Sequence, residues 1–310
     1  MLGAAMPCAS YAFAAPPTKS IFPSSPTSSD LDAAKADGSI ALWASHTPRA
    51  RQVAPWELKL FFRAEEDVQR QLGLRAQVDA DRTFGVIGAV AVGGVILSSI
   101  LLGGDSSSMA ADPLRTSLGY AAAAAPFVVL VAAVVLPDLV RKTLVSFWRL
   151  DPAYRKRQTY HEAGHFLCGY LTGLEVEKYD AATGAGASSA VQFGGSFGRD
   201  AASLDRLAVV SMAGVAAEVI TCGDAQGGVE DVNMLRGFMA SSSPPIVGRS
   251  QQDDRIRWGT LFALTLLQQH AGALHRLAIA LDNSDDVVTC IRAIEEANED
   301  QDERTEATEV

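Results

Sequence analysis

The sequence predicts a mainly helical protein in which two membrane-spanning helices precede a mostly helical domain with a small β element. Residues 83–104 and 116–137 are each a stretch of 22 residues without a charge, and about 20 apolar residues are enough to cross a bilayer. After residue 151 the apolar residues recur at helical spacing, with one Gly-, Ser- and Ala-rich interruption. Short extended candidates at 176–180 and 190–193 border this interruption, so we expect them to form the small sheet.

The N-terminal segment has the composition of a targeting leader. Its first 29 residues contain no acidic residue and are rich in Ala, Ser and Pro. We therefore expect residues 1–50 to be a leader that is largely disordered, the alternative being a disordered N-terminus without an address. Within it, CASYAFAAPP, with Phe13 after a run of small residues, is similar to the signal-peptide junction of plastid presequences in algae whose plastids came from a secondary symbiosis.

The segment before the first apolar stretch predicts a membrane-proximal helix within residues 51–82, because it mixes charges with apolar residues at helical spacing. Residues 105–115 then join the two spans and contain one basic residue, Arg115. Basic residues are more numerous in both outer flanks, so positive-inside bias places these flanks on the cytoplasm-like side of the membrane, which in a plastid is the stroma. A buried helical hairpin in a soluble protein is the alternative to two spans.

The composition of the rest of the chain excludes several classes of function. The formal net charge is -10, and residues 295–310 hold eight acidic residues and one Arg. We expect residues 138–298 to form a compact domain and residues 299–310 to be a disordered acidic tail. No basic stripe is interleaved with aromatic residues, so the sequence gives no indication of nucleic-acid binding. The four cysteines include no CxxC pair, which disfavours a cysteine zinc site or a disulfide framework.

The motif HEAGH at residues 161–165 is the strongest indication of chemistry. On a helix, residues four apart lie about 40° from one another around the axis, so His161 and His165 can bind one ion from a single face. That spacing suits two corners of a tetrahedral zinc site. Glu162 is then not a ligand but the general base that would activate water for attack on a carbonyl group. An ordinary amphipathic helix with a chance H-E-x-x-H is the alternative.

The third ligand is not determined by spacing. His46, His270 and His275 are expected to be structural or surface histidines, since the latter two lie five apart, about 140° around a helix. Glu218 is the one charge in an otherwise apolar helix, so it is either a ligand or a partner of a ligating histidine. Asp231 follows a Gly-Gly break where a helix is expected to start, so it is either a ligand or a first-turn charge that binds nothing.

Three motifs in order, HEAGHFLCGYL, AGVAAEVITCG and GGVEDVNML, resemble the zinc-peptidase domain of FtsH-type membrane proteases. The resemblance covers roughly residues 137–295 and implies a zincin-like domain in which Asp231 is the third zinc ligand and Glu218 supports the site. The later stretch DDRIRWGTLFALTLLQQH is similar to a plastid group of FtsH-like proteins that keep two spans and the peptidase domain but lack the ATPase.

The chain departs from FtsH because its 310 residues contain no G-x-x-x-x-G-K-[ST] motif, so we expect no ATP hydrolysis. The resemblance then implies a membrane-anchored zinc metalloendopeptidase of thylakoid or stromal proteins, in the thylakoid or inner envelope membrane, with its domain facing the stroma. It would receive loosely folded polypeptides or depend on a separate AAA ATPase or FtsH-type subunits. The alternatives are a non-hydrolytic FtsH-like membrane factor and an intramembrane metallopeptidase. The second is disfavoured by the basic residues 155–157, directly before the motif.

Overall fold

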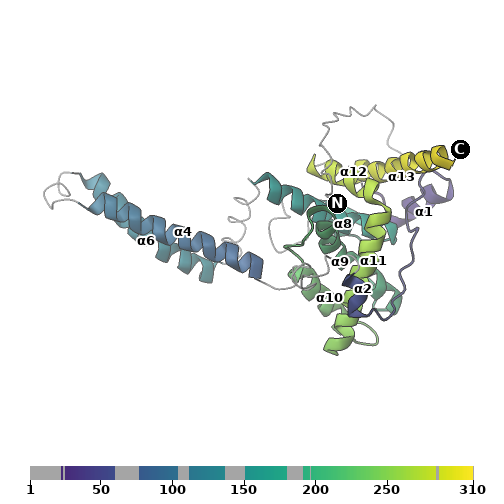
Figure 1. Ribbon diagram of the computed structural model, residues 1–310, viewed down its shortest axis with the longest axis horizontal. Coiled ribbons are helices and arrows are strands. Elements are labelled where there is room, and N and C mark those ends of the chain that lie inside the picture. The colour runs from purple at the N-terminus through teal and green to yellow at the C-terminus, as the bar shows by residue number, and fades with distance from the viewer. Residues whose placement is uncertain are drawn as a thin grey trace, which may run out of the picture.

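The computed structural model describes residues 22–23, 25–59, 77–103, 112–136, 151–179, 191–195, 197–283 and 286–309. The described chain is mainly helical with one small two-stranded sheet, as the sequence predicts (Figure 1). Its elements in order are α1 (Ser28–Ala36), α2 (Pro55–Lys59), α4 (Gln77–Leu102), α6 (Pro113–Val135), α8 (Pro152–Leu171), β1 (Val176–Tyr179), β2 (Val191–Phe193), α9 (Ala201–Cys222), α10 (Val229–Ser241), α11 (Arg249–Gln269), α12 (Ala271–Asp282) and α13 (Val287–Glu309).

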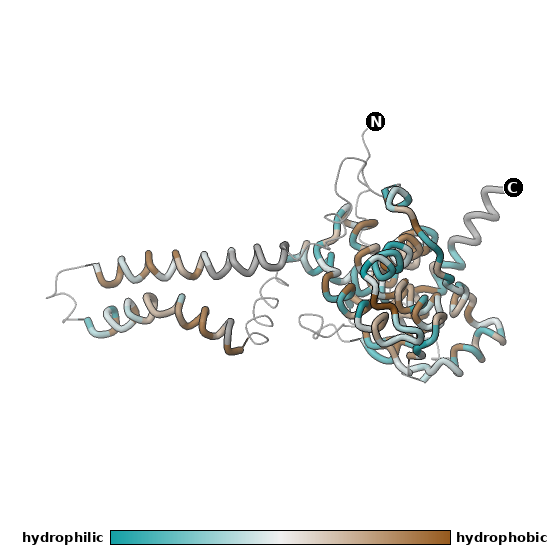
Figure 2. The backbone as a smooth tube through the Cα atoms, turned by 90° about the horizontal axis from the view of Figure 1, so that it is seen from below, coloured by the Kyte–Doolittle hydropathy of each residue, from teal (hydrophilic) through white to brown (hydrophobic). Residues whose placement is uncertain are grey.

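Helices α4 and α6 form an antiparallel hairpin that stands apart from the other helices (Figure 1). Apolar segments recur along both helices (Figure 2), and large apolar side chains such as Ile100 and Phe127 are exposed. The helices approach closely at Gly94, where a Cβ atom would lie 2.7 Å from the Ala122 carbonyl oxygen. At the tip of the hairpin, Arg115 Nε donates to the Leu101 carbonyl at 2.9 Å, so it satisfies an unpaired carbonyl in the last turn of α4.

Two membrane spans were expected, but only one described helix meets the length and composition that a span requires. Among the described residues, α6 is long and apolar enough to cross a membrane over Pro113–Ala132, whereas the apolar part that qualifies in α4 is the shorter stretch Gly88–Leu102. The helices also begin and end elsewhere than expected, since α4 starts at Gln77 and α6 at Pro113. Asp112 caps α6 by accepting from the Arg115 amide, which explains why this helix starts before residue 116.

The remaining helices surround the crossing of α8 and α9. Asp151 caps the start of α8, and Pro152 occupies its first turn, where a missing N–H removes no helical hydrogen bond. The two helices touch at Gly164, where a Cβ atom would lie 2.4 Å from the Ala213 carbonyl oxygen. Helix α11 approaches the other side of α9 in the same way, because a Cβ atom at Gly259 would lie 2.5 Å from the Ala208 carbonyl oxygen. Small residues therefore set the spacing of three central helices.

The small sheet lies against α8. Strands β1 and β2 pair antiparallel, with Val176 opposite Phe193 and Tyr179 opposite Val191, and the register shifts between Val176 and Lys178. A Cβ atom at Gly169 of α8 would lie 2.3 Å from the Phe193 ring, so the glycine makes room for this side chain. Both expected extended segments are confirmed as strands, while residues 180–190 between them lie outside the described part.

The expectation that residues 1–50 are largely disordered is wrong for residues 25–50. Residues 25–58, which we call the N-terminal strap, pack on the domain. Trp43 is 2% exposed and its ring centroid lies 5.3 Å from that of Tyr170. The Leu42 amide donates to Glu295 Oε1 at 3.0 Å, and the Tyr170 hydroxyl donates to the same oxygen at 2.7 Å. A few apolar residues in an Ala-, Ser- and Pro-rich segment bury enough surface to order it, although they follow no period that the sequence would reveal. Residues 1–21 and 24 lie outside the described part.

Two other boundaries differ from expectation. Of the predicted membrane-proximal helix over residues 51–82, the structure has α2 and the start of α4, and residues 60–76 lie outside the described part. The acidic tail is not irregular, since α13 continues to Glu309. Among the residues of α13 whose burial the structure describes, those up to residue 300, the last buried apolar one is Ala297. The helix continues past that point because Glu and Ala are good helix formers.

Trp43→Ala is expected to lower the free energy of unfolding by about 3–5 kcal/mol, because it removes a buried side chain and leaves a cavity between the strap and Tyr170. Trp56→Ala is the matched control, since Trp56 is 62% exposed. Urea unfolding of the full chain in detergent, followed by circular dichroism, measures both variants. Equal stability of the two would contradict docking of the strap on the domain.

Candidate metal centre

Helix α8 presents His161 and His165 to one point. Their Nε2 atoms lie 3.1 Å apart, and their ring centroids are 4.7 Å apart. Both side chains are largely buried, with 14% and 7% of their surface exposed. The two rings therefore converge as the spacing of HEAGH predicts.

The hydrogen bonds of the two Nδ1 atoms determine the tautomer of each ring, and therefore whether its Nε2 atom can bind an ion. His165 Nδ1 lies 2.7 Å from the Val210 carbonyl oxygen, which can only accept, so Nδ1 carries the proton and donates. His161 Nδ1 donates likewise to Glu218 Oε1 at 2.8 Å. In the neutral rings both Nε2 atoms are then bare, and two lone pairs 3.1 Å apart repel each other unless a cation lies between them. This donor set fits a metal ion, because ligating histidines usually donate their other N–H to a carboxylate or a backbone carbonyl.

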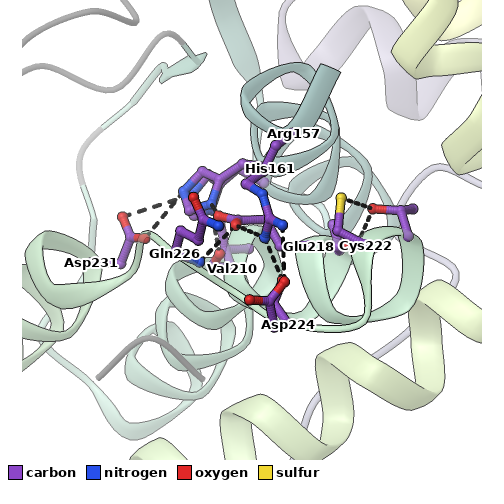
Figure 3. A network of polar contacts seen from close by, with 11 residues as sticks. Arg157, His161, Val210, Glu218, Cys222, Asp224, Gln226 and Asp231 are labelled. Carbon is purple, nitrogen blue, oxygen red and sulfur yellow. Dashed lines mark hydrogen bonds and ion pairs between the residues drawn. The ribbon is translucent and has the colours of Figure 1, made fainter. Parts of the chain in front are cut away.

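Asp231 completes the cluster from the first turn of α10. Its Oδ2 lies 3.2 Å from His161 Nε2, and its Oδ1 lies 3.7 Å from His165 Nε2 (Figure 3). The Gly-Gly break acts as expected, because Gly228 adopts the left-handed conformation with φ 112° and starts the helix. One ligand atom from each of His161, His165 and Asp231 lies within 4.8 Å of the others, so the three residues could hold a metal ion.

Glu218 lies behind His161 rather than among the ligand atoms, which resolves the alternative that the sequence left open. Its Oε1 accepts from His161, while its Oε2 accepts from Arg157 Nη1 at 3.1 Å and from the Gln226 amide at 2.9 Å (Figure 3). Arg157 also donates to Asp224 Oδ1 at 2.9 Å. Glu218 therefore orients His161 and is itself held by two further donors.

Sequence reasoning missed Arg157 as part of this site. It belongs to the RKR run before the motif, which predicts membrane topology from its charge alone. Its side chain lies on the motif's own helix, four residues before His161, so it shares one face of α8 with that histidine. Helical spacing from HEAGH was thus the signal that could have identified it.

The electrostatics of the cluster favour a positive charge between the ligand atoms. Burial alone would lower the pKa of His161, but the hydrogen bonds to Asp231 and Glu218 outweigh burial and raise it well above its ordinary value. Burial would raise the pKa of Asp231, yet electrostatic attraction to His165 and the hydrogen bond with His161 hold it below its usual range. The pKa of Glu218 is lowered against burial in the same way by His161. Both carboxylates are thus ionised at neutral pH and surround the two imidazoles.

Glu162 is buried beside the cluster without belonging to it. It is 7% exposed, and its Oε2 accepts from the Val191 amide of β2 at 3.3 Å. One residue along a helix turns the side chain about 100°, so Glu162 faces β2 while His161 faces α9 and α10. A buried carboxylate next to a metal cluster but outside the ligand set is suited to proton transfer.

A glycine on α9 forms the wall behind the ligand atoms. A Cβ atom at Gly214 would lie 2.5 Å from His161 Nε2 and 2.6 Å from His165 Nε2. No side chain can occupy this position without displacing both imidazoles. The sequence reasoning passed over Gly214 because its role depends on the crossing of two helices far apart in the chain.

The other histidines lie outside the cluster, and the described cysteines form no disulfide. The Tyr160 hydroxyl lies 2.6 Å from His275 Nδ1, and the rings of His46 and His270 meet edge to face at 5.4 Å. Cys168 and Cys290 are buried free thiols, and Cys222 is an exposed one.

No protein-family model matches the chain, and no curated protein or solved structure is detectably similar to it. The chemistry of the centre is accordingly inferred from its own residues and their geometry.

Gly214→Ala is expected to weaken metal binding, since the new methyl group overlaps both Nε2 atoms. Loss of a residue that hydrogen-bonds to a metal ligand lowers affinity by ~10–100-fold, and we expect an effect at least as large here. Gly237→Ala, on α10, is the control because nothing lies within 4 Å of its Cβ position. Competitive titration with a chromophoric zinc chelator measures both. Wild-type affinity in Gly214→Ala would show that the ion is held elsewhere.

Proposed function

We propose that the chain is a membrane-anchored, FtsH-like zinc metalloendopeptidase that hydrolyses peptide bonds of thylakoid or stromal plastid proteins. One observation carries this proposal: the Nε2 atoms of His161 and His165 meet a carboxylate of Asp231, while the buried Glu162, next to His161 in the chain, is not among the ligand atoms. Three ligands and one separate carboxylate are what hydrolysis by activated water requires.

The donor set favours zinc among the common metal ions. Two imidazoles and one carboxylate suit zinc, whereas calcium and magnesium prefer oxygen ligands throughout. Three protein ligands are typical of a catalytic site, since structural zinc sites use four. A bound zinc ion would supply Lewis-acid polarisation of the scissile carbonyl and lower the pKa of water.

The chain's own residues would perform the proton transfers. Glu162 would accept a proton from the attacking water and later donate it to the leaving amine. Glu218 and the Val210 carbonyl hold the two rings in the tautomer that leaves Nε2 free. The apolar residues around the motif, including Ala163, Phe166 and Leu167, are fully buried, which keeps the walls of the site dry and strengthens its electrostatic interactions.

The N-terminal strap supports membrane insertion of the whole hairpin. The strap precedes α4 and the domain follows α6, yet they pack on each other through Leu42, Trp43 and Glu295. Both must therefore lie on one side of any membrane, which requires an even number of crossings between them. A crossing by α6 alone would separate them, which favours a hairpin in which α4 crosses as well. The uncharged part of α4, residues 83–102, has 20 residues, which at about 1.5 Å each match the thickness of a bilayer core.

The location follows from the leader composition and the charge of the flanks. We place the hairpin in a plastid membrane, thylakoid or inner envelope, with the domain in the stroma, because basic residues are concentrated in the outer flanks.

The absence of a P-loop motif from the 310 residues bears on how substrates arrive. Without ATP-driven unfolding, the peptidase would act on loosely folded polypeptides or work with a separate AAA ATPase or FtsH-type subunits. The same absence favours the second candidate, a non-hydrolytic FtsH-like factor that binds polypeptides or assists a protease complex.

Glu162→Gln is expected to retain one zinc ion per chain and to lose cleavage of a casein-type substrate by a factor of about 10²–10⁴, because the ligand set is intact and the base is gone. Asp231→Ala should lose both zinc and cleavage. Elemental analysis and a fluorescence assay on the full chain in detergent measure the two properties. A wild-type protein that holds zinc and cleaves nothing would support the non-hydrolytic factor instead.

A cysteine introduced at Ser107 should react with an impermeant maleimide from the side of the membrane opposite to the exposed Cys222. The pair is compared in sealed vesicles before and after permeabilisation, with Cys222→Ser as the background for Ser107→Cys. Labelling of both thiols from the same side would rule out the two-span hairpin.

A further inference from the structure

A pocket of ≈ 240 Å³ lies between the start of α9 and the end of α10. Four apolar side chains line it, namely Phe197, Leu204, Leu207 and Phe238, with Arg199 and Ser241 among the polar residues. The rings of Phe197 and Phe238 meet at 60° with their centroids 6.2 Å apart, so the aromatic wall is packed in a favourable edge-to-face geometry. The pocket shares no residue with the metal cluster.

Both helices relate this pocket to the metal centre. On α9, Leu207 precedes Gly214 by seven residues, and on α10 Phe238 follows Asp231 by seven. Seven residues are nearly two helical turns, so each pocket residue lies on the same face as its site residue and about 10 Å along the axis. Measured along α9 and along α10, the pocket thus lies in the same direction from the metal centre and at the same distance, about 10 Å.

An exposed apolar side chain connects the two places. Met234 lies on α10 between Asp231 and Phe238, three residues after the first and four before the second, so it shares their face. It is 48% exposed, although water would favour a polar residue there. An apolar side chain is thus exposed on α10 between the metal ligand and the pocket, where a bound chain could contact it.

The size and lining of the pocket indicate its occupant. Pockets for drug-sized ligands measure about 300–1,000 Å³, so ≈ 240 Å³ suits a single large side chain better than a cofactor. Apolar walls favour a Leu, Met or Phe side chain, and Arg199 disfavours a basic one through like-charge repulsion. An extended chain rises about 3.3 Å per residue, so a distance of about 10 Å corresponds to three residues.

Resting on the proposed peptidase activity, we propose that this pocket binds a bulky apolar side chain of the substrate polypeptide, two or three residues from the bond that is cleaved. Phe238 is then a specificity-determining residue.

The test uses the full chain in detergent and a set of quenched fluorescent peptides that differ at one position, two or three residues to either side of the cleaved bond. Each position carries Phe, Ala or Lys. At one of these positions, the kcat/KM of wild type should be at least about tenfold higher for the Phe peptide than for the Ala peptide. The Lys peptide should have the lowest kcat/KM of the three. Phe238→Ala should reduce the Phe preference to below about threefold, because the rate with the Phe peptide falls more than the rate with the Ala peptide. Equal rates for all peptides, or an unchanged preference in Phe238→Ala, would overturn the proposal.

Two further variants and a binding measurement separate the pocket from other effects. Ser241→Phe, which fills the pocket, should lower the rate with Phe peptides selectively, and Ile279→Ala, exposed on α12, should behave as wild type. Zinc content is measured for every variant, so that loss of the metal is recognised. Should wild type cleave no peptide, the proposed activity fails. Binding of labelled Phe and Ala peptides to zinc-loaded Glu162→Gln, alone and with Phe238→Ala, then still decides whether the pocket recognises an apolar side chain.

Discussion

The close crossing of α8 and α9 is the constraint on which the rest of the domain depends. Glycine and alanine at the contact let the helix backbones approach, since a Cβ atom at Gly164 would strike the carbonyl of Ala213. The same approach brings the Val210 carbonyl and the Glu218 carboxylate within hydrogen-bonding distance of the two imidazoles. A wider spacing would leave both Nδ1 atoms buried without partners, at a cost of about 1–3 kcal/mol each. The packing of α8 on α9 and the hydrogen bonds of the two buried imidazoles therefore require the same helix geometry.

Charge balance is the second requirement of the site. Glu162, Glu218 and Asp231 bring three carboxyl groups into a largely apolar interior, and Arg157 pairs with Glu218. Isolated buried charges are costly unless they are paired. A divalent ion between the two Nε2 atoms would offset this negative charge, so we expect metal binding to stabilise this region.

The sequence predicted what local periodicity determines. The HEAGH helix, both strands and the start of α10 at the Gly-Gly break follow from spacing and from backbone preferences. Spacing left the choice between Asp231 and Glu218 open, and the resemblance to FtsH-type proteases favoured Asp231. The relative positions of α8, α9 and α10, which no single segment contains, place Asp231 in the cluster and Glu218 behind His161. The strap was missed for the same reason, because Leu42 and its partner Glu295 are 253 residues apart. Arg157 was assigned to topology, since a charge next to a membrane has two uses that composition cannot distinguish.

The strap also determines the order of biogenesis. Residues 25–58 leave the ribosome first, but their binding partners Tyr170 and Glu295 are made only after both hairpin helices. The strap therefore cannot dock until the chain is made through Glu295. If both hairpin helices cross a membrane, as proposed, a chain inserted in the wrong orientation or with one helix only could not close its domain, because the strap would lie across the bilayer from its partners. In that arrangement, domain closure would report correct insertion before the centre could act on a substrate.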